Sequence, residues 1–468
     1  MRFFLQARLF AALLFMGGCG DPIDNHIDDL MAGGEARDRA YMELLFARHY
    51  AVPPLLQALA DADHPPRGRA DVANLLWKIY LRDADTRIIE PLLDRIDDLA
   101  PLVRRAVAGG LREMGKPEII PFILERLETE TNDETQLELL RAMETLDGWD
   151  ARWQDSSSNV AVRGGGSLSP SDRERFALIT RAIYRRASYD SLRQQAGEFL
   201  ERFAMRYVQE AQQQILKADI TGAEASLLQA LDLKPDSKSL LLRLGKLYYL
   251  NSQQQKGLEL LEQHGLLLRL PQLSQIPTLD GDLSDPVWNE ALKIDQFYKS
   301  ASVMRPIPTD SRTEAFMGYR DNYIYIAVKN YEESTRGLSV DYRTHDSPVW
   351  RDDCIEVFFD TNMDQRSFYQ LVANAIGGTF DTFRGGDREY DQEWDGGLEV
   401  ATRIEPTFWT VEKAIAIASL HDLVVQSGDV WGFNLVRARI GLAAEHCQWL
   451  PTYGFTHRPD FFGLLIFD

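Results

Sequence analysis

The sequence predicts a multidomain protein in which an N-terminal all-α solenoid precedes a C-terminal antiparallel β-sandwich. Up to about residue 270, apolar residues recur at the spacing of amphipathic helices. Beyond Pro271 the pattern changes to short alternating runs rich in β-branched and aromatic residues, separated by turn residues. Because the helical and strand patterns occupy separate blocks, we expect separate domains.

The composition limits the classes of partner. The chain has 468 residues, which is enough for two to four domains with cores of their own. It carries 71 Asp and Glu against 51 Lys and Arg, and no basic block interrupts this acidic balance. A partner with a phosphate backbone would be repelled, so we do not expect nucleic-acid binding.

The first residues form a targeting signal. A short apolar run, Leu9–Met16, follows two arginines and precedes Gly17-Gly18-Cys19. The run is too short to span a bilayer. The pattern resembles a bacterial lipoprotein signal, which implies removal of residues 1–18 and lipidation of Cys19; a plain secretory signal is the alternative. Asp21 lies just after the position that favours inner-membrane retention, so we expect an outer-membrane lipoprotein facing the periplasm or the cell surface.

Residues 19–148 contain three versions of one helical segment. Each version carries proline near its start, where the missing N–H is harmless, and a second amphipathic helix follows it. The prolines are 37 and then 30 residues apart. The segments are Val52–Leu59, Ile88–Ile96 and Ile119–Leu127. This pattern resembles a short array of HEAT repeats.

A second helical block follows a Gly/Ser-rich linker at residues 149–170. In residues 171–270, Leu244-Gly245-Lys246-Leu247-Tyr248 has the Leu-Gly-x-x-Tyr spacing, and Gly257 lies 34 residues after Ala223. These features resemble tetratricopeptide repeats, in which small residues let two helices cross closely. Such arrays bind protein partners on a concave face, so we expect a protein partner here.

The strand Cys354–Asp360 carries the most informative motif of residues 271–468. Its alternation directs Ile355 towards a core and Glu356 to the opposite face, and Trp350 precedes it. The motif consists of a tryptophan, five intervening residues, a glutamate and a closing aspartate. It resembles a motif of the family 9 carbohydrate-binding module. The stretches Ile276–Trp288 and Phe461–Phe467 are similar to the opening and closing of that family.

The resemblance implies a β-sandwich that binds sugar without catalysis. The apolar face of a pyranose stacks on an aromatic ring such as Trp350, and its hydroxyls pair with polar groups such as Glu356. Gln370 and Asn374 share a face of the next strand and are expected to add hydrogen bonds. The family's second clamping tryptophan is replaced near the C-terminus. The residues that could take its place are Trp449, Tyr453 and Phe455.

Metal and disulfide predictions remain open at this level. Asp280, Asp282 and Asp285 have spacings that suit calcium, although Asp-rich turns also bond their own backbone. In an oxidising compartment Cys354 and Cys447 could pair, or they could remain free.

The sequence therefore predicts a lipid-anchored, non-catalytic carbohydrate-binding protein. The carboxylates around Glu356 are easier to explain as ligand acceptors than as a glycosidase pair. One alternative is a scaffold whose sandwich has lost its sugar. Another is a haem-binding sandwich, since related sandwiches hold haem between Met and His. The haem ligands considered are Met317 or Met363 with His345 or His421.

Overall fold

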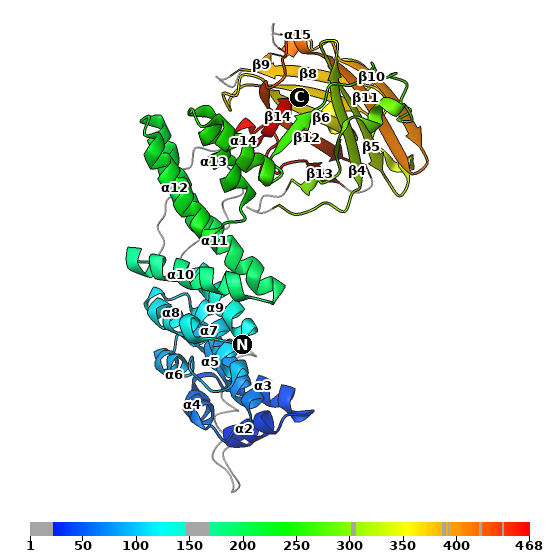
Figure 1. Cartoon of the computed structure of the whole chain (residues 1–468). Coiled ribbons are helices and arrows are strands. Elements are labelled where there is room, and N and C mark those ends of the chain that lie inside the picture. Colours follow the sequence, from blue (N-terminus) through cyan, green and yellow to red (C-terminus); the bar gives the residue numbers. More distant parts are fainter. Residues whose placement is uncertain are drawn as a thin grey trace. The chain divides into compact units, whose positions relative to one another are not determined.

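The computed structural model describes residues 22–146, 168–300, 306–385, 390–391, 393–420, 424–441 and 444–468. It contains two compact units that divide between Arg202 and Phe203. Helices make up the first unit, and helices followed by two β-sheets make up the second (Figure 1). The predicted combination of a helical region and an antiparallel sandwich is therefore confirmed. Cys19, the predicted signal and most of the predicted linker lie outside the described residues.

The first unit is built from paired helices. Its helices are α2 Pro22–Ala32, α3 Ala36–Ala47, α4 Val52–Ala60, α5 Pro66–Asp83, α6 Ile89–Asp94, α7 Pro101–Met114, α8 Ile120–Thr129, α9 Asp133–Leu146, α10 Pro170–Arg186 and the first part of α11 Asp190–Leu216. Proline stands in the first turn of α4, α5, α7, α8 and α10, as its fixed φ and missing N–H favour. Helix α7 buries Val103, Val107 and Leu111 on one face and packs against α5 and α9.

Buried ion pairs connect successive helix pairs of this unit. Arg104 Nε lies 2.6 Å from Glu130 Oε2, and Nη2 lies 2.7 Å from Oε1. Burial opposes ionisation of Glu130, but the hydrogen bonds from Arg104 and the Asn132 backbone outweigh it and lower its pKa to about 2. Arg69 makes a similar buried contact with Asp98. The buried Arg69 and Arg104 side chains thus each have a carboxylate beside them.

The second unit begins with the end of α11 and continues with α12 Ile220–Leu233, α13 Lys238–Leu250 and α14 Gln254–Gln263. Helices α13 and α14 approach closely at Gly257. A Cβ at this position would lie 2.6 Å from the Gly245 oxygen and 2.7 Å from the Tyr249 nitrogen. The sequence predicted a small residue there, and the contacts show that only glycine fits; the tetratricopeptide resemblance itself stays a prediction.

Two sheets form the sandwich. The larger has the strand order β1-β14-β12-β6-β7-β8-β9, with β13 joining β12 to β3, and the smaller has the order β10-β11-β5-β4-β2. The strands of the larger sheet are β1 Leu267–Leu270, β3 Tyr298–Lys299, β6 Cys354–Asp360, β7 Phe368–Asn374, β8 Thr379–Arg384, β9 Tyr390–Asp391, β12 Val430–Arg439, β13 Glu445–Gln448 and β14 Gly463–Phe467. Those of the smaller are β2 Leu292–Ile294, β4 Thr313–Arg320, β5 Tyr323–Tyr331, β10 Glu399–Glu405 and β11 Phe408–Ala416; the short helix α15 Ile417–Leu420 follows β11. These strands pair antiparallel except for β1 with β14.

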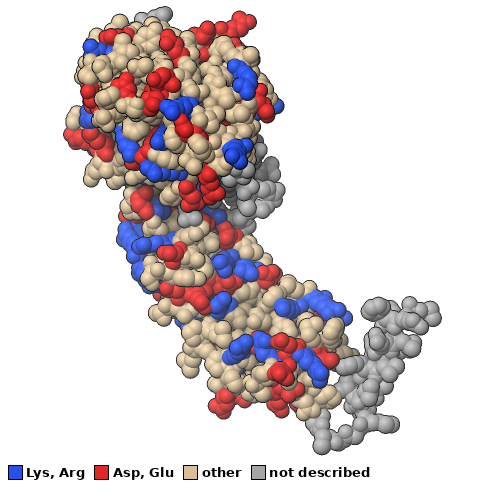
Figure 2. Space-filling model, turned by 90° about the vertical axis from the view of Figure 1, so that its right-hand side faces the viewer, with Lys and Arg blue, Asp and Glu red and all other residues tan. Residues whose placement is uncertain are grey.

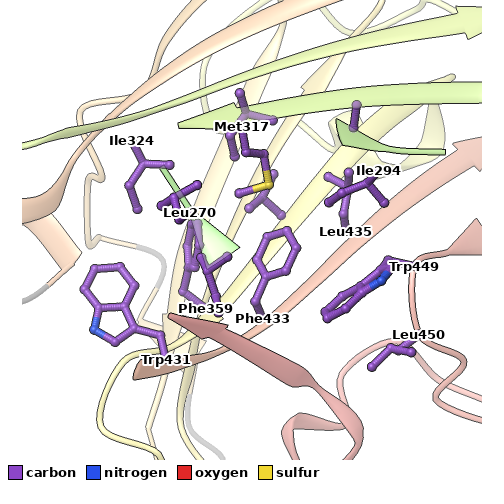
Figure 3. Close-up of a cluster of buried hydrophobic side chains, with 14 of the residues drawn as sticks. Leu270, Ile294, Met317, Ile324, Phe359, Trp431, Phe433, Leu435, Trp449 and Leu450 are labelled. Carbon is purple, nitrogen blue, oxygen red and sulfur yellow. The ribbon is translucent and has the colours of Figure 1, made fainter. Parts of the chain in front are cut away.

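The core of the sandwich lies between the two sheets. Phe359 and Phe433 come from adjacent strands of the larger sheet, and Met317 points towards them from the smaller sheet (Figure 3). Trp431 packs edge-on against Phe359, with ring centroids 5.7 Å apart. The inward set predicted for β6, which includes Ile355 and Phe359, is indeed buried here.

Helix α13 also packs on the sandwich within the second unit. Lys246 Nζ, which is buried, donates to the backbone oxygens of Pro459 and Asp460 at 3.2 and 3.3 Å. The Arg243 guanidinium lies 4.8 Å from the centroid of the Phe461 ring. Leu241 belongs to the same apolar core as the strands. These helices and the sandwich therefore share one core, although the sequence pattern changes at residue 270.

The described part of the chain contains no helix with the length and apolar character needed to cross a membrane. On the face drawn in Figure 2, Lys and Arg side chains are interspersed with Asp and Glu side chains. The formal net charge of the full chain is −20.

Candidate functional site

The candidate site lies on the outward face of the larger sheet. Glu356 on β6 stands opposite Val372 on β7, and Val372 stands opposite Phe380 on β8. Directly opposed residues share a face, so these three side chains form a row across the sheet. The Trp350 ring packs edge-on against Phe380 with centroids 4.5 Å apart. Trp350 is 39% exposed, so part of its ring is open to solvent at the end of the row.

Glu356 is paired with an amide. Gln370 Nε2 donates to Glu356 Oε2 at 2.7 Å, and the two side chains are 4% and 6% exposed, respectively. Burial raises the pKa of Glu356 to about 7, against the lowering influence of Gln370 and of the Lys413 charge. The predicted neighbourhood of Trp350, Glu356 and Gln370 therefore exists, but its polar part is largely covered.

Lys413 is a charged residue that sequence reasoning missed. It lies on β11 and points into the sandwich core, where its Nζ donates to the backbone oxygens of Ile355 at 2.7 Å and Leu371 at 3.1 Å. Burial lowers the pKa of Lys413 to about 7, although the nearby thiol of Cys354 and the Glu356 carboxylate act against this. A lysine on the apolar face of an alternating strand was the signal that could have identified it.

The structure gives Asn374 a supporting role. Its Nδ2 donates to the Tyr342 oxygen at 2.6 Å and to Asp352 Oδ2 at 2.8 Å, and its Oδ1 accepts from Gly378 N at 2.8 Å. The side chain is fully buried. Because these bonds use its polar atoms to fix the loop before β6, Asn374 positions that loop rather than offering free donors to a ligand.

The three aromatic candidates near the C-terminus lie in different environments. Trp449 is 5% exposed and packs in the core, with its ring centroid 5.6 Å from that of Phe433 (Figure 3). Tyr453 is buried and contacts Phe461 edge-on. Phe455 is 63% exposed. Thus Trp449 is a core residue, because the β13 register directs it inward, and of the three only Phe455 presents most of its ring to solvent.

A histidine also belongs to the outward face. His457 lies beside Phe358 and Phe368, with ring centroids 5.6 Å away in both cases. Its Nδ1 is 3.1 Å from the hydroxyl of Tyr390. Burial, together with the Arg384 charge, lowers the pKa of His457 to about 4, so the ring is neutral at pH 7. This group was not identified from the sequence because it follows no regular spacing.

The predicted calcium ligands instead cap turns. Asp280 accepts from the Asp282 backbone at 2.8 Å, Asp282 accepts from Ser284 N at 3.1 Å, and Asp285 accepts from Thr278 N at 3.1 Å. Asp282 also pairs with a surface arginine. Among the described residues, these three carboxylates do not form a group that could hold a metal ion. The Asp-rich stretch is therefore a series of turns bonding their own backbone.

The two cysteines are free and buried on opposite faces of the sheet. Cys354 points outward beside Val349 and Phe380, whereas Cys447 points into the core between the sheets. A disulfide cannot form across the sheet, because their side chains point apart.

The haem ligands considered do not form a coordination pair in the described residues. Met317 is fully buried among apolar side chains of the core, and Met363 is 8% exposed. His345 lies at the surface with its Nδ1 3.1 Å from Thr379 Oγ1, and His421 lies outside the described residues. Haem could reach Met317 only if the sandwich core opened.

Comparisons with known proteins agree with the division into helical repeats and a sandwich. Residues 279–447 match the family model described as carbohydrate family 9 binding domain-like. Residues 52–144 match the model of HEAT repeats, which confirms that prediction. No curated protein matches the chain.

Two solved structures have some similarity to part of this chain. A candidate carbohydrate-binding protein from Bacteroides uniformis is 17% identical, with a TM-score of 0.35; the match covers 43% of this chain and 99% of that chain. A family 9 carbohydrate-binding module from Caldicellulosiruptor kristjanssonii, solved with cellotriose, is 18% identical, with a TM-score of 0.33; it covers 43% of this chain and 93% of that chain.

Proposed function

We propose that the sandwich binds a saccharide, without catalysis, on the outward face of β6, β7 and β8. The observation that carries this proposal is the exposed ring of Trp350 at the end of the row that contains Glu356. The ring offers a stacking surface to the apolar face of a pyranose. The family match to residues 279–447 supports the same class of ligand.

Glu356 is proposed as the acceptor for a sugar hydroxyl. Gln370 uses only Oε2, which leaves Oε1 for a ligand. A hydrogen bond to a desolvated carboxylate is stronger than one in water, since the local dielectric is low. Because the pair is buried, the ligand reaches it from the Trp350 side after a rearrangement of surrounding side chains.

The test is a glycan-array screen followed by calorimetry on the whole chain, beside Trp350→Ala. We expect binding of an oligosaccharide that falls at least tenfold in this variant. Tyr50→Ala, which removes a 69% exposed aromatic ring from the first unit, should bind like the wild type. A folded wild-type protein that binds no glycan, or equal binding by Trp350→Ala, would refute the proposed site.

The second candidate function is a scaffold whose sandwich contacts another protein and holds no sugar. The burial of Glu356 and Gln370 and the position of Trp449 in the core favour this alternative. An empty glycan array for a folded protein would make it the better explanation.

We also propose that Cys19 carries a lipid that anchors the protein to the outer membrane, facing the periplasm or the surface. The apolar run followed by Gly17-Gly18-Cys19 supports this localisation. Labelled palmitate should be incorporated by the wild type and not by Cys19→Ser, which should move to the soluble fraction. Unchanged labelling in the variant would exclude this anchor.

The helical repeats are proposed to bind a protein partner. The first unit exposes large apolar side chains, of which Leu99 is 95% and Phe46 62% exposed. Crosslinking in cells, compared between the wild type and Leu99→Asp, tests whether a specific complex depends on the exposed Leu99 side chain.

A further inference from the structure

Three segments of the sandwich bring metal-binding side chains together outside the proposed sugar site. His345 lies in the loop before β6, Asp381 lies on β8, and Asp395 lies in the turn before β10. One potential ligand atom from each residue lies within 4.8 Å of the other two. His345 and Asp395 are exposed, so an ion can reach the group from solvent.

Asp381 is the unusual member of this group. Its side chain is fully buried, and neither carboxylate oxygen has a hydrogen-bond partner of good geometry among the described residues. Burial raises the pKa of Asp381, against the lowering influence of the Gly396 backbone and the His345 charge. A buried carboxylate without a partner is costly and requires an explanation, such as a bound cation. The inference therefore rests on the position of the buried Asp381 carboxylate beside the potential ligand atoms of His345 and Asp395.

The chain also orients the other two ligands. Thr379 Oγ1 lies 3.1 Å from His345 Nδ1, and the other ring nitrogen, Nε2, lies 3.4 Å from Asp346 Oδ2 at the surface, a contact that a metal ion at Nε2 would replace. The backbone bond from Asp346 N to Thr379 O, at 3.0 Å, ties this loop to β8. Asp395 Oδ1 accepts from Gly397 N at 2.8 Å, which leaves Oδ2 available. A metal-binding histidine is commonly fixed in this way through its second nitrogen.

We propose that His345, Asp381 and Asp395 bind a divalent transition-metal ion of the zinc class. One imidazole and two carboxylates suit such an ion better than calcium, which prefers oxygen ligands alone. Three protein ligands leave a coordination position for water. The bound ion neutralises the orphaned carboxylate and joins the loop of His345 to β8.

The loop of His345 continues directly into Trp350. An ion at this site would therefore restrict the loop that presents the exposed ring. This consequence rests on the proposed sugar binding, but metal binding itself does not and is tested separately.

The experiment titrates Zn²⁺ into the untagged whole chain after removal of metal with EDTA, using calorimetry and thermal unfolding. We expect one Zn²⁺ per chain and a raised melting temperature. Asp381→Asn and His345→Ala should each weaken binding at least tenfold. Asp321→Asn, at a turn position with φ of 48° where asparagine is tolerated, should bind Zn²⁺ like the wild type.

A folding defect is distinguished from a lost ligand by the metal-free proteins. Asp381→Asn removes an unpaired buried charge, so without metal it should melt at the wild-type temperature or above. Co²⁺ in place of Zn²⁺ gives a visible absorption band that should change in His345→Ala. Absence of Zn²⁺ binding, equal binding by Asp381→Asn, or equal Ca²⁺ and Zn²⁺ binding with no effect of His345→Ala would overturn the proposal.

Discussion

Buried charges have different partners in the first unit and on the outward face of the sandwich. In the first unit Arg104 and Glu130 form two short hydrogen bonds, and the pKa of Glu130 falls to about 2. On the sandwich face Glu356 has the neutral amide of Gln370 as its partner, and its pKa rises to about 7. Both carboxylates are buried, so the presence of a cation at contact distance decides the direction of the shift.

In the described residues, the buried Glu356 lacks an ion-pair partner, but this is not a property of the whole sandwich. Arg437 is also buried there, but Glu332 lies 2.6 Å away and also pairs with Arg439. The sandwich can therefore pair its buried charges and does not do so around Glu356. Perturbed and incompletely paired groups of this kind are more common at functional sites than elsewhere.

Breaking a pair in the first unit should have the largest effect. Arg104→Met leaves Glu130 buried without its main partner, so we expect a loss of about 3–5 kcal/mol in the free energy of unfolding. Urea unfolding followed by circular dichroism measures this change. Arg105→Met is the control, since its pair with Glu134 is exposed and contributes at most about 1 kcal/mol. Similar effects in both variants would contradict the distinction between buried and exposed pairs.

The Glu356→Gln variant should raise the free energy of unfolding, whereas Arg104→Met should lower it. The size of this gain should depend on pH. The pKa of Glu356 is about 7 in the folded chain against an ordinary value of 4.5, so the native state binds the additional proton between these values. Wild-type stability therefore falls as pH rises through this window, because the buried carboxylate must ionise.

The amide in Glu356→Gln cannot ionise, so above pH 8 the variant should be the more stable protein, by up to about 3 kcal/mol. At pH 4 the two proteins should differ little. Urea unfolding at both pH values measures the difference, and a difference that is independent of pH would show that Glu356 is not held in its neutral form.

Close helix contact in the second unit is tested by Gly257→Ala. The added Cβ would meet the backbone of α13 at 2.6–2.7 Å, so one helix must move, and we expect a loss of about 1–3 kcal/mol. Gly109→Ala in α7 is the matched control, because its nearest neighbour would be a side-chain oxygen at 3.5 Å. That change should be neutral or stabilise the protein by up to about 1 kcal/mol. A neutral Gly257→Ala would contradict the close crossing of α13 and α14.

The sequence predicted those features that depend on local periodicity. Prolines in first helical turns located the HEAT repeats, and the alternation of β6 placed Ile355 inside and Glu356 outside. Glycine spacing also indicated where α13 and α14 meet. Each of these features follows from the regular geometry of a helix or a strand. The residue pattern along the sequence is therefore enough to predict it.

The failures involve contacts between distant segments. Trp449 and Phe455 are six residues apart, but Trp449 continues the pairing of β13 with β12 and is buried in the core, whereas Phe455 lies beyond that pairing and is exposed. Asn374 looked available, yet it bonds Tyr342 from a loop thirty-two residues earlier. His345, Asp381 and Asp395 have no common spacing and meet only when three segments fold together.

Trp350→Ala should change stability least. The ring is 39% exposed and touches Phe380 at its edge, so its removal uncovers less apolar area than the loss of a core tryptophan, and we expect a loss of at most about 1 kcal/mol. Urea unfolding of the variant measures this loss, and its near-UV circular dichroism should keep the wild-type tertiary signal. A loss of 3 kcal/mol or more would mean that Trp350 is a packing residue of the sheet edge. A small loss of stability together with lost saccharide binding would show that the Trp350 ring serves binding rather than packing. Glu356 would differ from it, because its substitution alters stability in a way that depends on pH.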